Sequence, residues 1–588
     1  MADETLVAPE DTSTAAASSG NGQAAPAFGT DRSEVLATFY GDESFPIEWK
    51  DDEEKGRFWW YDDLHCPQPI SPLWFDIGGW WYTCAYMYRR FGLPFGEDWI
   101  AKNINGYVYT SVVRPSDERA AQVGPYFGLV AGTYGYKFHE WWEERILPQT
   151  LRNMEYLDTF PLEEVSLPEL MIHLEEALDI QEQHFRYHWQ LNLSQFLAFV
   201  NFKNTFADLC GGHDADIEGD ILLSLDDRNW DSIRALTRLR DKVADHPALQ
   251  AAFEPDSGDE IIANLRQTEA GQRFLAEDIK AYQNEYGFKA MYTHEYAFET
   301  WYENPRPIIQ GIKGYLVSDY DVDAEVEKTR QKRDAAIEEM WRRLQNEADR
   351  PKLQEALDVA LLMAPLTPDH HFYYDQGTYA RVRLVYMAVG RRFVQMGLLD
   401  DPEDIVYFKH DEIRNLAGAP DAEKARATVE ERKETRMNAY SIRPRDWVGS
   451  ASKWALYEEP YVGLWGYPGV FERSQSKQTE PADEVRGLAA SPGVVEGTAR
   501  VVASPAEFDQ VREGDIMVCK MTNPAWVVVF TKIRGLVTDS GGVLAHPAVV
   551  AREFGIPAVV GCLDATHRIK NGDRVRVNGM AGTVTILS

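Results

Sequence analysis

The apolar pattern of the sequence changes once along the chain, near residue 485, and this change limits the folds that are possible. Before it, apolar residues recur at spacings of three and four, which is typical of amphipathic helices, most clearly over 161–206, 322–363 and 379–396. After it come short β-branched runs separated by turns, at 499–502, 515–518, 535–538, 559–560 and 575–577. The pattern predicts a multidomain protein with a mainly α-helical body and a small C-terminal α/β domain.

Composition sets the domain boundaries that we expect. A chain of 588 residues is too long for one hydrophobic core. Residues 1–30 are mostly Ala, Ser, Gly, Thr and Pro, which predicts a disordered tail, and 463–485 lack a sustained period, which predicts a hinge linker. The helical body would then span 31–462 and the small domain 486–588, where Asn571-Gly572-Asp573 predicts a tight hairpin.

Charge and cysteine content narrow the class of protein. The formal net charge is −34, and all of the excess acid lies before residue 486, because residues 486–588 carry a small net positive charge. Such a body would repel a polyanion, which argues against nucleic acid as a ligand. The sequence contains five cysteines, without metal-ligand spacing, and no apolar run of membrane-spanning length, so we expect a cytoplasmic protein that binds no membrane.

One histidine of the small domain stands in a pattern suited to chemistry. His546 follows Gly541 and Gly542 and lies between two apolar runs. A neutral imidazole is a nucleophile near pH 7 and forms a labile phosphoramidate, which suits a phosphoryl relay. Glycines let backbone N–H groups approach a phosphoryl group, and a helix that starts near Ala548 would favour an anion there. The alternative is an ordinary core histidine beside a glycine turn.

The segment 538–561, which runs from Thr538 to Gly561 and contains His546, resembles the phosphohistidine swivelling domain of the PEP-utilising enzymes. This family includes phosphoenolpyruvate synthase, pyruvate phosphate dikinase and rifampin phosphotransferase. The resemblance implies that His546 carries a phosphoryl group between two distant sites, that Gly541 and Gly542 cradle it, and that the C-terminal domain moves about the linker.

Parts of the helical body resemble the substrate-binding domain of rifampin phosphotransferases. The matching segments are 63–73, which ends in Ser-Pro-Leu, 286–305, and 390–408. Phe288 and Lys289 replace a His-Arg pair of that family, so the function of that histidine is not carried over.

The sequence lacks the glycine-rich phosphate loop of an ATP-grasp domain and has no Walker motif. The chain in this respect resembles the histidine-bearing subunit of phenylphosphate and 4-methylphenylphosphate synthases. That resemblance implies a separate ATP-grasp subunit that holds ATP with Mg²⁺ or Mn²⁺, in a hetero-oligomer of aromatic catabolism. The products would be an aryl phosphate, AMP and phosphate. The alternatives are a component of an antibiotic phosphotransferase and a phosphocarrier protein.

The acceptor hydroxyl needs a base, because a phenol has a pKa near 10, and the transferring group needs a cation. The richest polar stretch predicts four catalytic candidates, with a histidine as base and an acid as its orienter: Asp369, His370, His371 and Asp375. Four residues are predicted to bind the substrate: Tyr373, Arg383, His65 and Glu295. The alternatives are a capped helix start with surface histidines, and arginines paired with local acids. His184 and His188 lie one helical turn apart without a carboxylate-rich motif, so no metal site is predicted.

Overall fold

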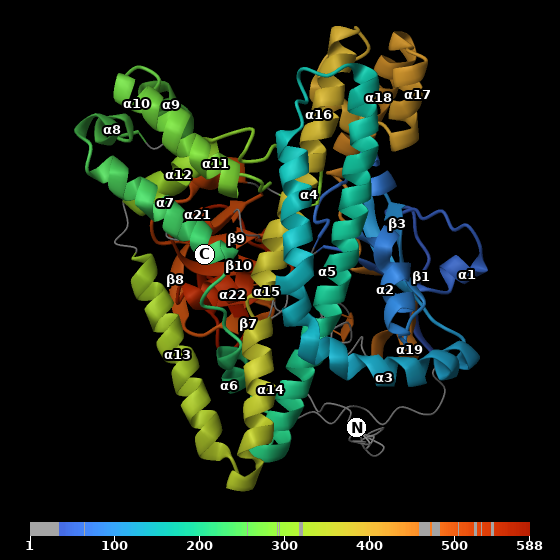
Figure 1. Ribbon diagram of the computed structural model, residues 1–588, viewed down its shortest axis with the longest axis vertical. Helices are drawn as coiled ribbons and strands as arrows, with labels where there is room; N and C mark the ends of the chain where they lie inside the picture. Colours follow the sequence, from blue (N-terminus) through green and yellow to red (C-terminus); the bar gives the residue numbers. More distant parts are fainter. Residues whose placement is uncertain are drawn as a thin grey trace, which may run out of the picture.

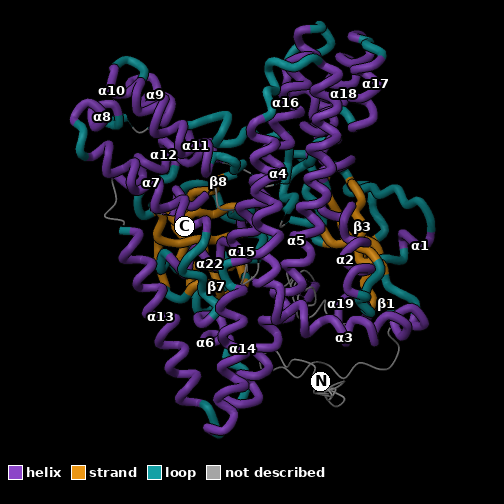
Figure 2. Tube along the Cα trace, viewed as in Figure 1, coloured by secondary structure: helices purple, strands orange, loops and turns teal. Residues whose placement is uncertain are grey.

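A computed structural model describes residues 34–587, except 64, 256, 291, 293, 317–320, 458–470, 473–482, 504, 523–525, 531 and 542–545. Strands gather in two places, one near each end of the chain, and long helices fill the space between them (Figures 1 and 2). The expected tail, 1–30, and most of the expected linker, 463–485, lie outside the described residues. The multidomain, mainly helical fold with a small C-terminal α/β region is confirmed.

The first part of the body is a sheet, which the sequence analysis did not predict. Its five strands pair in the order β1-β5-β2-β4-β3, all antiparallel. They are β1 (Val35–Phe39), β2 (Phe58–Tyr61), β3 (Asp98–Ile104), β4 (Tyr107–Val113) and β5 (Trp447–Ser452). Asn105 and Gly106 join β3 to β4 with positive φ angles of 54° and 91°, the conformation of a two-residue hairpin turn. Strand β5 lies far from β1 and β2 in sequence but pairs with both, so it joins the end of the body to its beginning.

The helical part is organised around α5 (Leu167–Cys210), a helix of 44 residues that starts at a capping box of Ser166 and Glu169. Helices α3 (Asp117–Trp141), α14 (Arg350–Met363) and α16 (Tyr379–Gln395) pack against it. The remaining α-helices before the last strand of the sheet are α1 (Asp52–Lys55), α2 (Cys84–Phe91), α4 (Leu147–Thr159), α6 (Ala215–Ile221), α7 (Arg228–Ala244), α8 (Pro247–Ala252), α9 (Gly258–Leu265), α10 (Glu269–Arg273), α11 (Lys280–Tyr286), α12 (Arg306–Leu316), α13 (Val322–Arg343), α15 (Leu366–His370), α17 (His410–Gly418) and α18 (Ala422–Ala439).

The helix predictions hold, with two changes. The stretch 322–363 is two helices, α13 and α14, because Asn346 and Pro351 favour a break between them. Several helices also contain wider π-helical turns, and one of them, η6 (His371–Thr378), connects α15 to α16. Such turns are frequent at functional sites, since they turn side chains out of the regular helical register. No helix in the described part of the chain is both long enough and apolar enough to cross a bilayer.

The C-terminal domain is an eight-stranded sheet in the order β6-β13-β12-β8-β9-β10-β11-β7. Its centre, from β8 to β11, is parallel, and the outer strands are antiparallel. The strands are β6 (Glu484–Arg486), β7 (Leu488–Ser491), β8 (Val494–Val502), β9 (Asp515–Cys519), β10 (Ile533–Thr538), β11 (Ala558–Val560), β12 (Arg574–Asn578) and β13 (Thr583–Ile586), with helices α21 (Val527–Phe530), α22 (His546–Glu553) and α23 (Ala565–Arg568). All the predicted strands are present. The predicted hairpin at 571–573 was wrong, because this turn joins α23 to β12.

The C-terminal domain packs on the body through an apolar face. Helix α21 lies against α12, and one continuous buried cluster contains Ile308 and Ile312 of the body together with Trp526 and Phe530 of the C-terminal domain. In Figure 1 this contact lies where the red C-terminal domain meets the green helices. The parallel centre of the sheet is therefore fixed relative to the body from one side.

Helix α16 should not tolerate a side chain at Gly390, where a Cβ atom would lie 2.3 Å from the carbonyl oxygen of Pro402. Because backbone blocks the space, we expect Gly390→Ala to reduce the free energy of unfolding by about 1–3 kcal/mol. The matched control is Gly128→Ala, on the exposed side of α3, where a Cβ atom would meet nothing within 4 Å. That variant should be unchanged or more stable by up to about 1 kcal/mol. Thermal unfolding followed by circular dichroism measures both, and equal midpoints would contradict the packing of α16.

Candidate active site

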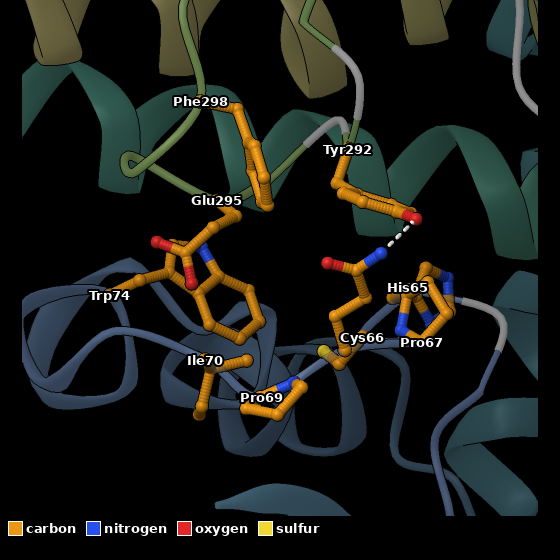
Figure 3. Close-up of a pocket in the computed structure, with 10 residues that line it drawn as sticks. His65, Cys66, Pro67, Pro69, Ile70, Trp74, Tyr292, Glu295 and Phe298 are labelled. Carbon is orange, nitrogen blue, oxygen red and sulfur yellow. Dashed lines mark hydrogen bonds between the residues drawn. The ribbon is translucent and has the colours of Figure 1, made fainter. Parts of the chain in front are cut away.

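A small pocket lies between two loops of the body that are distant in sequence. One loop follows β2 and the other follows α11, and Figure 3 shows their side chains facing each other. The pocket encloses about 240 Å³ of space, including the part open to solvent. The lining residues are His65, Cys66, Pro67, Gln68, Pro69, Ile70, Trp74, Tyr292, Glu295 and Phe298. The walls are mainly apolar and aromatic, with a few polar groups, as is usual for a small-molecule site.

Hydrogen bonds hold the two loops together. Glu295 accepts from the backbone N–H and the hydroxyl of Ser71, at 2.7 and 2.6 Å, and the amide of Gln68 donates to the Tyr292 hydroxyl at 2.5 Å (Figure 3). Two of the predicted substrate-binding residues, His65 and Glu295, therefore line one pocket.

His65 is oriented by a buried acid. Its Nδ1 atom lies 2.8 Å from Oδ1 of Asp62. The other carboxylate oxygen of Asp62 accepts a hydrogen bond from the indole N–H of Trp80 at 3.1 Å. Burial lowers the pKa of His65, but the Asp62 carboxylate outweighs it, so the pKa lies above its ordinary value. This Asp-His pair leaves Nε2 of His65 available to exchange a proton.

Next to His65 is a buried cluster of histidines around the carboxylate of Asp375, which is 1% exposed. Nδ1 of His188 and Nε2 of His294 lie 3.1 and 3.4 Å from Oδ1 of Asp375, and Nε2 of His370 lies 3.8 Å from Oδ2. His371 also pairs with this carboxylate. The ring of His294 is 5.7 Å from the ring of His65, measured between centroids, which connects the cluster to the pocket.

The cluster sets the ionisation of its members. Burial raises the pKa of Asp375, but His188 and His371 lower it by more and hold it well below its usual range. Burial also lowers the pKa of His370 well below its ordinary value, and that of His294 to a smaller extent. Asp375 is therefore ionised and these two rings are neutral at pH 7.

Three of the predicted site residues have other partners. Asp369 accepts the backbone N–H of Arg228 at 2.9 Å at the start of α7, and burial raises its pKa to about 7. Tyr373 is packed in an apolar cluster with Trp142. Arg383 is 1% exposed and its guanidinium binds Glu303, Glu403 and the Tyr296 carbonyl oxygen, so binding of a substrate by this arginine does not fit.

Sequence reasoning missed Asp62, His188 and His294. Asp62 precedes His65 by three residues, an available signal, whereas His188 and His294 are isolated in sequence and join the cluster only through folding. The neighbouring His184 is satisfied elsewhere, by Thr378 at 2.8 Å and Asn153 at 3.0 Å.

In the C-terminal domain, the carboxyl ends of the parallel strands face the loop after β2, which forms one side of the pocket. At the carboxyl ends of β9 and β10, Ser540 donates a hydrogen bond to Asp63, and the Lys520 ammonium lies 5.0 Å from the ring centre of Tyr61. Gly541 has a φ of 110°, and His546 begins α22 at the same edge. Gly542 and the side chain of His546 lie outside the described residues. Because ligands of parallel sheets bind at this edge, it is the expected place for a reactive group.

Comparisons agree with this organisation. Residues 511–582 match the mobile domain of PEP-utilising enzymes, and residues 205–366 match the fourth domain of rifampicin phosphotransferase. These two parts of the chain are therefore similar to two domains found in PEP-utilising phosphotransferases.

Individual relatives share parts of the chain. An uncharacterized phosphotransferase of Bacillus subtilis, YvkC, is 30% identical over 68% of this chain and 47% of its own length. Rifampicin phosphotransferase of Bacillus cereus is 28% identical over 60% and 39%. A probable phosphoenolpyruvate synthase of Pyrococcus abyssi is 44% identical over 20% and 14%. The chain spans less than half the length of each of these relatives.

Docking of the C-terminal domain on the pocket loop should weaken as the pH rises. Burial raises the pKa of Asp63 to about 6, although the Ser540 hydrogen bond and the charge of Lys520 lower it. If docking raises the pKa of Asp63, this carboxyl takes up a proton when the domain docks. Its contribution to the free energy of docking is then complete below pH 3.8 and is lost as the pH rises past 6. A shift of about two units corresponds to about 3 kcal/mol if undocking returns the carboxyl to water.

Small-angle scattering between pH 5 and 8 measures this effect as an increase in the radius of gyration. Asp63→Asn keeps an acceptor for Ser540 but cannot ionise, so it should remove the increase. Asp52→Asn, on the exposed helix α1, is the control and should behave like the parent chain. The same increase in the Asp63→Asn variant would show that another group controls docking.

Proposed function

We propose that the chain is a phosphotransferase subunit in which His546 relays a phosphoryl group from ATP to the hydroxyl of a phenolic substrate. ATP and Mg²⁺ or Mn²⁺ would be held mainly by a separate ATP-grasp subunit. The observation that carries the proposal is the contact between Ser540 and Asp63. Through this contact, the end of the sheet at which α22 begins lies against the loop that contains His65. The match of residues 511–582 to the mobile domain of PEP-utilising enzymes supports the relay.

The reaction has two transfers. In the first, a nitrogen of the His546 imidazole takes the β-phosphoryl group of ATP. One water molecule is consumed to release the γ-phosphoryl group as phosphate, and the remaining product is AMP. In the second, the phenol oxygen attacks this phosphorus, the P–N bond breaks, and the phenol proton passes to Nε2 of His65. The carboxylate of Asp62 contacts Nδ1 of His65 and stabilises the imidazolium that forms there.

The walls of the pocket support an aromatic acceptor. Trp74, Phe298 and Ile70 provide flat apolar contacts of the kind that line small-molecule sites. Such walls favour a planar phenol over a macrocyclic antibiotic. A phosphocarrier protein would need no such pocket.

The relay predicts that a His546→Ala variant loses the phosphoryl intermediate. With an ATP-grasp partner, Mg²⁺ and β-labelled ATP, the parent chain should become labelled and transfer the label to phenol. The variant should do neither, with an unchanged circular dichroism spectrum. Label on another side chain would refute the relay, and transfer to a rifamycin but not to phenol would refute the substrate class.

The role of His65 predicts a separate effect on the second transfer. His65→Asn can still donate a hydrogen bond to Asp62 but cannot accept the phenol proton, so phenol phosphorylation should fall by about 10²–10⁴-fold. Labelling of His546 from ATP should not change. His213→Asn, which alters a histidine paired with Glu218 at the start of α6, is the control. Unchanged transfer in His65→Asn would exclude this histidine as the base.

A further inference from the structure

The histidine cluster around Asp375 contains a group of donors with the spacing of metal ligands. His188 on α5, His370 at the end of α15 and Asp375 in η6 each offer an atom, and the three atoms all lie within 4.8 Å of one another. Nδ1 of His188 lies 3.1 Å from Oδ1 of Asp375, and Nε2 of His370 lies 3.8 Å from Oδ2 of the same carboxylate. Ligands of a tetrahedral ion with bonds of about 2.1 Å are about 3.4 Å apart, so each histidine lies near that distance from one carboxylate oxygen.

The hydrogen bonds of the cluster are incomplete. Within the described part of the chain, the buried atoms Nδ1 of His188, Nε2 of His370 and Oδ1 of Asp375 have no hydrogen-bond partner, nor does either ring nitrogen of His294. An unsatisfied buried polar atom costs about 1–3 kcal/mol, so several that face one point are a departure from ordinary packing. An ion at that point would satisfy the three donor atoms together.

The orientation of the rings fits the same interpretation. Nδ1 of His370 lies 3.1 Å from the carbonyl oxygen of Leu366, which fixes the proton on that nitrogen and leaves a lone pair on Nε2, toward Asp375. Such a carbonyl contact behind the ring is the usual support of a metal-binding histidine.

We propose that His188, His370 and Asp375 bind a divalent first-row transition-metal ion, with Zn²⁺ or Mn²⁺ as representative ions. Two imidazoles and one carboxylate suit this class of ion better than Mg²⁺ or Ca²⁺, which prefer oxygen ligands. The ion would join α5, α15 and η6 behind the pocket, and His294 would separate it from His65. This site goes beyond the proposed reaction, because binding requires neither ATP nor phenol.

The test measures metal retained by the full chain. After removal of metal with a chelator, loading with Zn²⁺ and gel filtration, the parent chain should retain about one equivalent. His188→Gln and His370→Gln should retain less than about a tenth of an equivalent. The control His213→Gln should retain as much as the parent chain, because His213 lies before α6 and pairs with Glu218, outside the cluster.

Spectroscopy keeps the proposal testable if the variants fold poorly. Co²⁺ bound to the parent chain should give visible absorption bands of a nitrogen- and oxygen-ligated ion, and one equivalent of Zn²⁺ should remove them. Less than about a tenth of an equivalent of retained Zn²⁺ in the parent chain would overturn the site. So would full retention by both cluster variants, which would place the ion elsewhere. If the parent chain retains the metal but does not phosphorylate phenol, the result contradicts the proposed reaction and not the metal site.

Discussion

The buried carboxylate of Asp375 is the constraint on which the site depends. An ionised acid at 1% exposure is costly unless other groups compensate it, and here four histidines from α5, α15, η6 and the loop after α11 surround it. The two rings that lower the pKa of Asp375 most, His188 and His371, lie on α5 and η6, so loss of either contact would leave the charge less compensated. The cluster therefore fixes the loop that carries His294, Glu295 and Phe298, and with it one wall of the pocket.

The C-terminal domain has two contacts of different physical kinds. Toward α12 it buries apolar side chains such as Trp526 and Phe530, which favours a lasting association that depends little on pH. Toward the loop after β2 it makes polar contacts through Ser540 and Lys520, beside the acid Asp63. Polar contacts with titratable groups can form and break at small cost, and these are the contacts next to the pocket. In the proposed relay, this polar contact would be the interface that opens.

Local sequence patterns predicted the elements that depend on local preference. The C-terminal strands follow from β-branched runs, and the long helices follow from their apolar period. The N-terminal sheet was missed because β5 pairs with β1 and β2 across more than 300 residues, and the aromatic run 58–61 gives no clear alternation. The Asn105-Gly106 turn was a local signal that was overlooked. In the site, matching motifs predicted His65 and Glu295, whereas His188 and His294 became neighbours of Asp375 only through tertiary packing.

The charges of the site suggest a division of work between body and mobile domain. The lining of the pocket contains an acid, Glu295, and an imidazole, His65, but no lysine or arginine among the described lining residues. Arg436 lies behind the wall, bound to the Pro69 carbonyl oxygen and facing the ring of Phe298. A transferring phosphoryl group needs positive charge near its oxygens. In the proposed relay, Lys520 and the start of α22 would bring positive charge together with the phosphoryl group, and the body would supply the proton acceptor.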